Sequence, residues 1–305
     1  MFSVIFPGQG SQIVGMGKEF YDKFELVKSL FKEADETLNY SISKLILKGP
    51  KEELDLTANT QPAIFLISYS IFNVIKKEFN VDLNKAKYFA GHSLGEYSAL
   101  SCAGYLNFAE TLKILRIRGD AMQNSVPKGE GGMVAVLGST VEAIEKILKD
   151  NETKFLAQIA NDNSEGQIVL SGKTQDLEKL TETLKDNSIK NIKLPVSAPF
   201  HCSLMSKATE IMTEELNKIS FSDGSNKLIS NVTNLLLALY WGKMNGDATS
   251  FNFTPNTGTT GICISSKTLT FKLNNCWRYW DSIDTLICVD KMRFTVFIHA
   301  LTSLP

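Results

Sequence analysis

A serine between two glycines is the clearest chemical signal in this sequence. Gly91-His92-Ser93-Leu94-Gly95 has the form G-x-S-x-G, in which the glycines permit a sharp turn from a strand into a helix. Such a turn exposes the serine hydroxyl at the start of the helix, beside backbone N–H groups that can stabilise an oxyanion. Ser93 is therefore a candidate nucleophile, and the N–H of Leu94 is the first candidate oxyanion donor. The alternative is a glycine-rich turn with an incidental serine.

A serine hydroxyl is a weak nucleophile and needs a base. The chain has three histidines, His92, His201 and His299. His92 adjoins Ser93 in a tight turn, from which we do not expect its ring to reach the hydroxyl, and His299 lies in a carboxyl-terminal segment of unusual composition. His201 follows the rigid segment Pro-Val-Ser-Ala-Pro-Phe at 195–200 and is the best candidate base.

Short strands and amphipathic helices must position these residues, because residues 1–124 alternate between the two patterns. Apolar runs at 3–6 and 88–90 predict strands, and a helical apolar period covers 60–79. The second of these strands runs directly into the serine turn. Strands that alternate with longer helices predict an α/β fold with a mainly parallel sheet.

A different pattern follows a loop that is rich in proline and glycine at 127–132. Strands are predicted at 133–137, 155–159, 167–170 and 191–194, with helices at 141–149 and 175–184. The resulting βαββαβ order is that of the ferredoxin-like motif. We therefore expect an inserted subdomain at 125–196, between core segments at 1–124 and 197–234.

Six motifs occur in order along the first 234 residues. They are Pro7-Gly8-Gln9-Gly10-Ser11-Gln12, Thr60-Gln61-Pro62-Ala63, Gly91-His92-Ser93-Leu94-Gly95-Glu96-Tyr97, Arg118-Gly119, Ser197-Ala198-Pro199-Phe200-His201 and Asn231-Val232-Thr233. Together they resemble the malonyl-CoA:acyl-carrier-protein transacylase family, which is related to acyltransferase domains of fatty acid and polyketide synthases. The resemblance implies an α/β-hydrolase-like core with a ferredoxin-like insert. It also implies transfer of malonyl from malonyl-CoA to the phosphopantetheine thiol of acyl carrier protein, in fatty acid biosynthesis.

The resemblance implies roles for individual residues. Ser93 would attack the malonyl thioester while His201 accepts its proton and later activates the carrier thiol. The backbone N–H groups of Gln9 and Leu94 would form the oxyanion hole. Arg118 would bind the free carboxylate of malonate through a bidentate, charge-assisted pair, although the residues alone indicate a solvated helix position.

Four other residues are weaker candidates for the substrate site. Phe200, directly before the histidine, resembles the malonyl-selective pattern of the family. Gln61, Asn161 and His92 are expected to line the site. The turn at 8–12 lacks the spacing of a phosphate-binding loop, and we interpret it as a backbone turn beside the nucleophile. No bound cofactor and no metal is expected.

The composition changes near Asn234. Residues 235–305 contain ten charged side chains and no Glu, whereas the first 234 residues contain 55 charged side chains, nineteen of them Glu. The tail also lacks the Gln-containing loop, the Pro-Val-x-Trp motif and the Gly-Pro-Gly that follow in the family, where the carbonyl of that Gln orients the histidine. Two interpretations compete: a β-rich tail, or a shifted reading frame or chimeric join. We favour the second, which would compromise activity.

Composition also bears on partners and compartment. The formal net charge is -1, which does not favour nucleic acid or an anionic membrane surface as a partner. Five cysteines without a CxxC pair indicate neither a disulfide framework nor a zinc site. The amino terminus shows no targeting pattern and no apolar run reaches membrane length. We therefore expect a cytoplasmic monomer whose partners are malonyl-CoA and acyl carrier protein.

Two other functions compete with malonyl transfer. A serine esterase or lipase would share the serine turn and the base, but it would need no arginine facing the acyl group. It should also show an acidic residue of the triad between Ser93 and the histidine. A catalytically impaired relative would bind CoA or carrier protein without forming a covalent acyl-enzyme, and the altered tail motivates this alternative.

Overall fold

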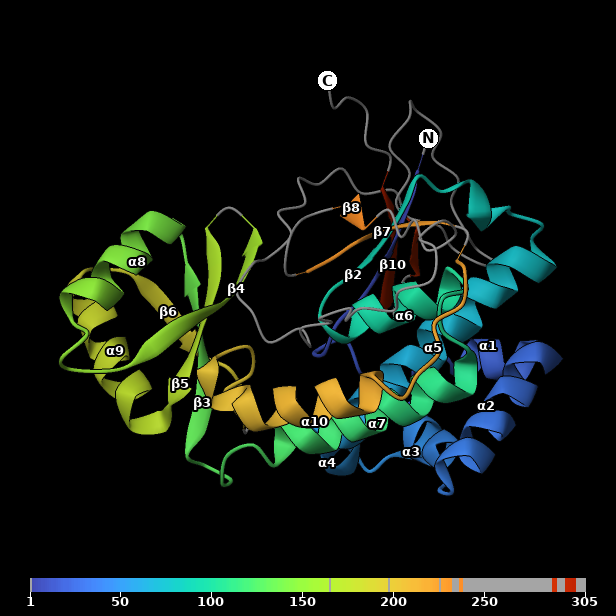
Figure 1. Cartoon of the computed structure of the whole chain (residues 1–305), viewed down its shortest axis with the longest axis horizontal. Helices are drawn as coiled ribbons and strands as arrows, with labels where there is room; N and C mark the ends of the chain where they lie inside the picture. Colours follow the sequence, from blue (N-terminus) through green and yellow to red (C-terminus); the bar gives the residue numbers. More distant parts are fainter. Residues whose placement is uncertain are drawn as a thin grey trace.

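The computed structural model describes residues 2–164, 166–196, 198–224 and 226–231, together with the backbone of strands at 236–237, 287–289 and 294–299. The described elements form a six-stranded and a four-stranded sheet (Figure 1). Helices α7 and α10 run between the helices that cover the first sheet and the strands of the second (Figure 1).

The six-stranded sheet contains both strands that the sequence predicts in the first 124 residues, at 3–6 and 88–90. Its strands, in spatial order, are β8 (Leu236–Leu237), β7 (Lys227–Ile229), β2 (Tyr88–Gly91), β1 (Ser3–Phe6), β10 (Phe294–His299) and β9 (Ile287–Val289). The three strands β7, β2 and β1 are parallel, whereas β8 and β10 pair antiparallel with their neighbours. All four residues of β2 are buried, as expected of a parallel strand that is covered on both faces.

Helices that cover this sheet are mostly amphipathic, and two are buried along most of their length. They are α1 (Lys18–Lys23), α2 (Glu25–Leu38), α3 (Ile42–Lys48), α4 (Lys51–Leu54), α5 (Thr57–Glu78), α6 (Leu94–Cys102), α7 (Phe108–Gln123) and α10 (Ser206–Leu216), with short 3-10 turns η1 (Leu83–Lys85) and η2 (Ser203–Met205). The buried helices are α6, which is buried at every position, and α5, which packs against α6 and α7. Pro62 has no N–H to donate to the carbonyl of Ala58, and Arg116 of α7 donates to that carbonyl at 3.4 Å instead.

The four-stranded sheet is antiparallel throughout and has the order β4-β5-β3-β6. Its elements follow the chain order β3 (Gly131–Leu137), α8 (Val141–Asp150), β4 (Ala157–Ser164), β5 (Gln167–Lys173), α9 (Thr174–Asp186) and β6 (Lys190–Lys193). Side chains of β3 alternate between two cores, because successive residues of a strand point to opposite faces. Val134 and Val136 pack with α8 and α9, whereas Met133 and Ala135 pack with α7 and α10.

The predicted elements are present, and the α/β fold class is confirmed. The one strand that the sequence misplaces is β4, predicted at 155–159 and observed at Ala157–Ser164. Phe155 is apolar because it is buried in the core below α8, but it belongs to the turn before the strand, where its N–H bonds to Asn151 O. The polar half of β4 escaped prediction because an apolar pattern cannot indicate it.

Within the described residues, no helix has both the length and the apolar character needed to cross a bilayer. The interpretation of the tail concerns residues 235–305, which lie outside the described residues apart from the backbone of β8, β9 and β10.

Candidate active site

The turn from β2 into α6 places Ser93 at the amino terminus of the helix. Ser93 has φ 54° and ψ -111°, a backbone conformation that costs free energy for any residue with a side chain. A Cβ on Gly91 would lie 1.9 Å from the carbonyl carbon of Gly95, and a Cβ on Gly95 would lie 2.5 Å from the carbonyl oxygen of Phe6. Both flanking positions therefore require glycine, because backbone atoms occupy the space of a side chain.

The structure brings Ser93 and His201 together. Ser93 Oγ lies 3.0 Å from His201 Nε2, and both residues are buried. Arg118 Nη2 lies 3.2 Å from the same Oγ, and a guanidinium can only donate a hydrogen bond. Ser93 Oγ thus accepts from Arg118, which leaves its own hydrogen for His201 Nε2. This arrangement assigns the Nδ1–H tautomer to His201, the form in which Nε2 can take the hydroxyl proton.

The segment that follows β6 holds His201 in place. His201 has φ 57°, in the left-handed region that non-glycine residues rarely adopt. The preceding Phe200 is buried in the core between β3 and α10. After the histidine, the N–H of Ser203 donates to Gln158 Oε1 of β4 at 2.6 Å. The histidine is thus fixed from both sides by contacts with the four-stranded sheet and the helices beside it.

Arg118 is buried, with 2% of its surface exposed, which corrects the interpretation from the residues alone as a solvated helix position. Its Nη1 donates to Gln61 Oε1 of α5 at 2.7 Å, and its guanidinium lies over the ring of Tyr97, 5.5 Å from the centroid. Burial lowers the pKa of Arg118, while Tyr97 and Glu96 oppose this shift. A cation therefore faces the nucleophile from a site that water does not reach.

Gly119 lets α7 approach α5 closely enough for the Arg118–Gln61 bond. A Cβ at this position would lie 2.6 Å from both Ala58 Cα and Thr57 O, which are backbone atoms of α5. In the motif Arg118-Gly119, the arginine therefore supplies the guanidinium, and the glycine allows the close approach of α7 to α5 that brings this guanidinium to Gln61.

Two residues with no predicted role complete the network around the nucleophile. Asn231 Nδ2 donates to Gly91 O at 2.6 Å, and Asn231 Oδ1 accepts from the N–H of Ser93 at 2.7 Å. Glu96 Oε2 accepts from the N–H of Asn231 at 3.3 Å. Burial raises the pKa of Glu96 to about 7, against the opposing effects of Asn231, Ser230 and Arg118. The sequence shows these two residues only as polar members of two motifs: Glu96 in Gly91-His92-Ser93-Leu94-Gly95-Glu96-Tyr97 and Asn231 in Asn231-Val232-Thr233.

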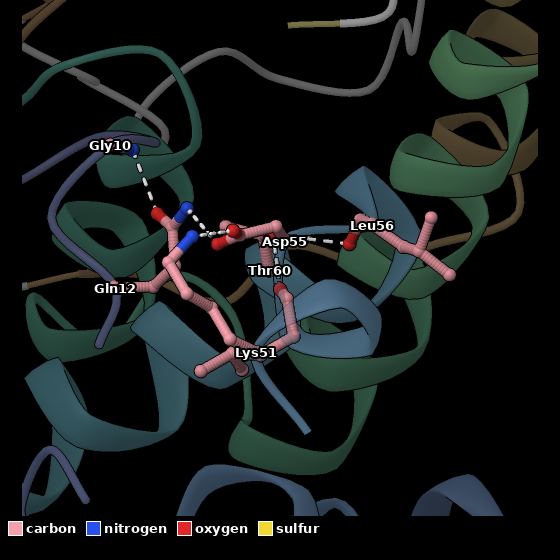
Figure 2. A network of polar contacts seen from close by, with 7 residues as sticks. Gly10, Gln12, Lys51, Asp55, Leu56 and Thr60 are labelled. Atoms are coloured by element: carbon pink, nitrogen blue, oxygen red, sulfur yellow. Dashed lines mark hydrogen bonds and ion pairs between the residues drawn. The ribbon is translucent and has the colours of Figure 1, made fainter. Parts of the chain in front are cut away.

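The turn after β1 carries Gln9, the second predicted oxyanion donor. Gln9 Nε2 donates to Thr57 Oγ1 at the start of α5, at 3.2 Å. Figure 2 shows a further support, in which Gln12 Oε1 accepts from the N–H of Gly10 at 2.8 Å and Gln12 Nε2 donates to Asp55 Oδ1 at 2.9 Å. Asp55 also accepts from Lys51. Partial burial raises the pKa of Asp55, but the hydrogen bonds from Lys51 and Gln12 outweigh it and keep this pKa below its ordinary value.

The remaining predicted residues lie around this centre. Leu94 is buried at the first position of α6, directly after Ser93. His92 Nε2 lies 3.2 Å from Asn163 Oδ1 of β4. Asn161 opposes Val169 at an irregularity of β4, and within the described residues it makes no hydrogen bond to Ser93, His201 or Arg118.

No group of three or more metal-ligating side chains occurs in the described part of the chain. The described centre brings together a serine, a histidine and a buried arginine.

Comparison with known proteins identifies the family of this chain. The family model of the acyl transferase domain matches residues 3–243. The malonyl CoA-acyl carrier protein transacylase of Bacillus subtilis (strain 168) is 45% identical over 232 residues, which are 75% of this chain and 72% of the relative.

Solved structures agree as well. The malonyl CoA-acyl carrier protein transacylase from Clostridium perfringens superposes with a TM-score of 0.75 at 39% identity, covering 85% of this chain and 78% of that one. A malonyl-transacylase in complex with its type II PKS acyl-carrier protein gives a TM-score of 0.73 at 35% identity, covering 77% and 75%. The chain is thus an acyltransferase and belongs to the acyl transferase domain family, among the malonyl CoA-acyl carrier protein transacylases.

Proposed function

We propose that this chain transfers the malonyl group of malonyl-CoA to the phosphopantetheine thiol of acyl carrier protein, in fatty acid biosynthesis. The observation that carries the proposal is the joint contact of Ser93 Oγ with His201 Nε2 at 3.0 Å and with the buried guanidinium of Arg118 at 3.2 Å. The names of the relatives and the complex with an acyl-carrier protein support the choice of substrate and partner.

Acylation of Ser93 is the first half of the reaction. Ser93 Oγ attacks the thioester carbonyl carbon while His201 Nε2 takes the hydroxyl proton. The N–H groups of Gln9 and Leu94 donate to the oxyanion that develops on the carbonyl oxygen. The carbon–sulfur bond then breaks, and the proton on His201 goes to the sulfur. This leaves the CoA thiol and a malonyl ester on Ser93.

Transfer to the carrier reverses these steps. The phosphopantetheine thiol gives its proton to His201 and attacks the ester carbonyl. The bond between the carbonyl carbon and Ser93 Oγ breaks, and Oγ recovers the proton from His201. One histidine thus serves as base and acid in both halves, which requires that the same ring face the serine and the incoming thiol.

Arg118 selects the acyl group by its charge. A buried guanidinium is costly unless an anion or several acceptors compensate it, and the malonyl carboxylate supplies such an anion in a bidentate, charge-assisted pair. An acetyl group or a simple ester has no carboxylate and leaves this compensation unmade. The burial of Arg118 beside the nucleophile therefore favours malonyl transfer over the hydrolysis of simple esters.

We also propose the division of the chain that the sequence predicts. Residues 1–124 and 197–234 form the α/β-hydrolase-like core, and residues 125–196 form the ferredoxin-like subdomain. What supports this division is that β3 to β6, with α8 and α9, all come from the second segment. His201 lies just after the chain returns to the core. Phe200 and the candidate Asn161 would line the substrate site from this boundary.

The test is formation of a covalent intermediate. The purified chain is incubated with malonyl-CoA, and intact mass followed by peptide mapping locates a malonyl ester, with Ser93→Ala as control. A Ser93 adduct that transfers to the thiol of an acyl carrier protein is the expected result. Binding of CoA or carrier without an adduct would instead indicate an impaired relative, and faster hydrolysis of simple esters would indicate an esterase.

A further inference from the structure

The side chain of Asn231 continues the pairing of β7 with β2 beyond the end of both strands. The parallel pairing runs through Tyr88–Lys227, Phe89–Leu228 and Ala90–Ile229, and the chain then leaves β2 to form the nucleophile turn. Asn231 Nδ2 donates to Gly91 O and Asn231 Oδ1 accepts from the N–H of Ser93, on either side of His92. In parallel sheets, one residue bonds in this way to the two residues that flank its partner.

An amide side chain can replace a peptide group because it offers a donor and an acceptor in one plane. The backbone of β7 cannot itself follow the turn, because β2 bends there into α6. Asn231 therefore supplies from its side chain the hydrogen bonds that the next peptide of a straight strand would supply. The two groups that it satisfies, Gly91 O and the N–H of Ser93, lie on either side of His92 and lead into the strained residue Ser93.

Glu96 fixes Asn231 in turn. A glutamate in the first turn of a helix commonly accepts from the N–H of the residue that caps that helix. Here the capping residue is Ser93, whose N–H is bonded to Asn231 Oδ1, and Glu96 Oε2 accepts from the N–H of Asn231 at 3.3 Å. Both residues are buried, with 8% of Asn231 and 7% of Glu96 exposed. Helix α6, which begins directly after Ser93, thus fixes Asn231 through Glu96, and Asn231 in turn fixes the backbone of Ser93.

We propose that Asn231 is a positioning residue for the acyl-transfer reaction. It holds the backbone of Ser93 in the conformation that keeps Oγ on His201 Nε2, and Glu96 orients it. A strained conformation persists only where its surroundings determine it fully, and Asn231 fixes the backbone that leads into Ser93 through Gly91 O and the N–H of Ser93. This proposal rests on the proposed function, since it concerns the same nucleophile.

Three variants of the full chain test it against a matched control. Asn231→Ala removes both bonds, and Asn231→Asp keeps the shape and the acceptor but loses the donor to Gly91 O. Asn226→Ala is the control, because Asn226 is also buried at β7 and donates to two backbone carbonyls, Asn84 O at 2.9 Å and Ala86 O at 3.1 Å, away from the nucleophile. Glu96→Gln, which keeps an acceptor for the N–H of Asn231, is the conservative variant.

The readouts separate positioning from folding. We measure the single-turnover rate of Ser93 acylation by malonyl-CoA, the half-saturating malonyl-CoA concentration, and the rate of Ser93 labelling by a fluorophosphonate. The acylation and labelling rates of Asn231→Ala should fall by about 100-fold, as expected for a misplacement of about 1 Å, with half-saturation unchanged. Asn226→Ala should lose thermal stability but keep both rates, and Glu96→Gln should keep most of both.

Equal rates for Asn231→Ala and Asn226→Ala, or a rise in half-saturation that accounts for the whole effect, would overturn the proposal. If Asn231→Ala does not fold, Asn231→Asp decides by the same comparison. Labelling of Ser93 by the fluorophosphonate does not depend on malonyl-CoA. An unaltered chain that is labelled but not malonylated therefore contradicts the proposed function, while the labelling rates of the variants still decide the role of Asn231.

Discussion

Replacement of Gly119 by alanine tests how the helices position the substrate arginine. The new Cβ would lie 2.6 Å from Ala58 Cα and Thr57 O, whereas ordinary contact begins at 3.4 Å. These are backbone atoms that cannot rotate away, so α5 and α7 must separate by about 0.8 Å. Overpacking of this kind costs about 1–3 kcal/mol and lowers the melting temperature by several degrees.

The same separation should stretch the bond from Arg118 to Gln61, which measures 2.7 Å. A hydrogen bond to a charged group contributes about 1.5–3 kcal/mol, so kcat/KM for malonyl-CoA should fall by about 10- to 100-fold. Transfer of acetyl from acetyl-CoA should change less, because an acetyl group has no carboxylate for Arg118 to bind. The malonyl-to-acetyl ratio of kcat/KM is therefore the decisive quantity.

Gly132→Ala is the matched control, because a Cβ there would meet only Leu177 Cδ1 at 3.5 Å. Thermal unfolding and steady-state transfer to acyl carrier protein are measured for both variants. The reasoning fails if Gly119→Ala keeps the melting temperature and kcat/KM of the unaltered chain. It also fails if malonyl and acetyl transfer fall equally, since the damage would then lie at Ser93 and not at Arg118.

Three further changes probe single contacts. Arg118→Lys cannot reproduce a planar bidentate donor, and the malonyl-to-acetyl ratio of kcat/KM should fall by about 10- to 100-fold, with the melting temperature as the folding control. Gln12→Ala removes the hydrogen bonds that support the turn of Gln9, so the single-turnover rate of acylation should fall by about tenfold, with the half-saturating concentration of malonyl-CoA unchanged. Lys51→Ala is the control, because it removes only an exposed ion pair and should change this rate little. Because burial raises the pKa of Glu96 from 4.5 to about 7, the folded chain binds more protons than the unfolded chain between these pH values, and its stability falls as the pH rises through them. Urea unfolding at pH 5 and pH 8 should show this loss, of about 3 kcal/mol, in the unaltered chain and not in Glu96→Gln; equal losses in both would assign it to other groups.

Local patterns were sufficient to predict the elements of the four-stranded sheet and those that lead into the serine turn, but not α1 to α4, α7 or α10. The strand at 3–6 is β1 as predicted, and each predicted element of the four-stranded sheet is present within a few residues. Apolar periodicity carries this information because β3, β5, α8 and α9 each bury at least one face. It failed at β4, whose second half is the polar run Asn161-Asp162-Asn163-Ser164, and where Phe155 is buried without belonging to a strand.

The site could be predicted only in part, for a different reason. Ser93 was predicted from the glycines that flank it and His201 from the scarcity of histidine, and the structure places Ser93 Oγ 3.0 Å from His201 Nε2. Asn231 and Gly119 were visible in motifs, but their contacts depend on the parallel pairing of β7 with β2 and on the approach of α7 to α5. Both features join segments far apart in the chain, which no periodicity records.

Ser93 and His201 share a backbone feature that explains why distant contacts matter here. Their φ angles are 54° and 57°, where glycine would be less strained but would lack the side chain that the chemistry requires. The structure must therefore hold both residues by contacts from elsewhere, and Asn231 reaches Ser93 across 138 positions. Arg118, for which we propose selection of the acyl group, comes from yet another helix, α7. A G-x-S-x-G turn alone thus indicates a nucleophile, whereas the assembled sheet and helices decide which acyl group that nucleophile accepts.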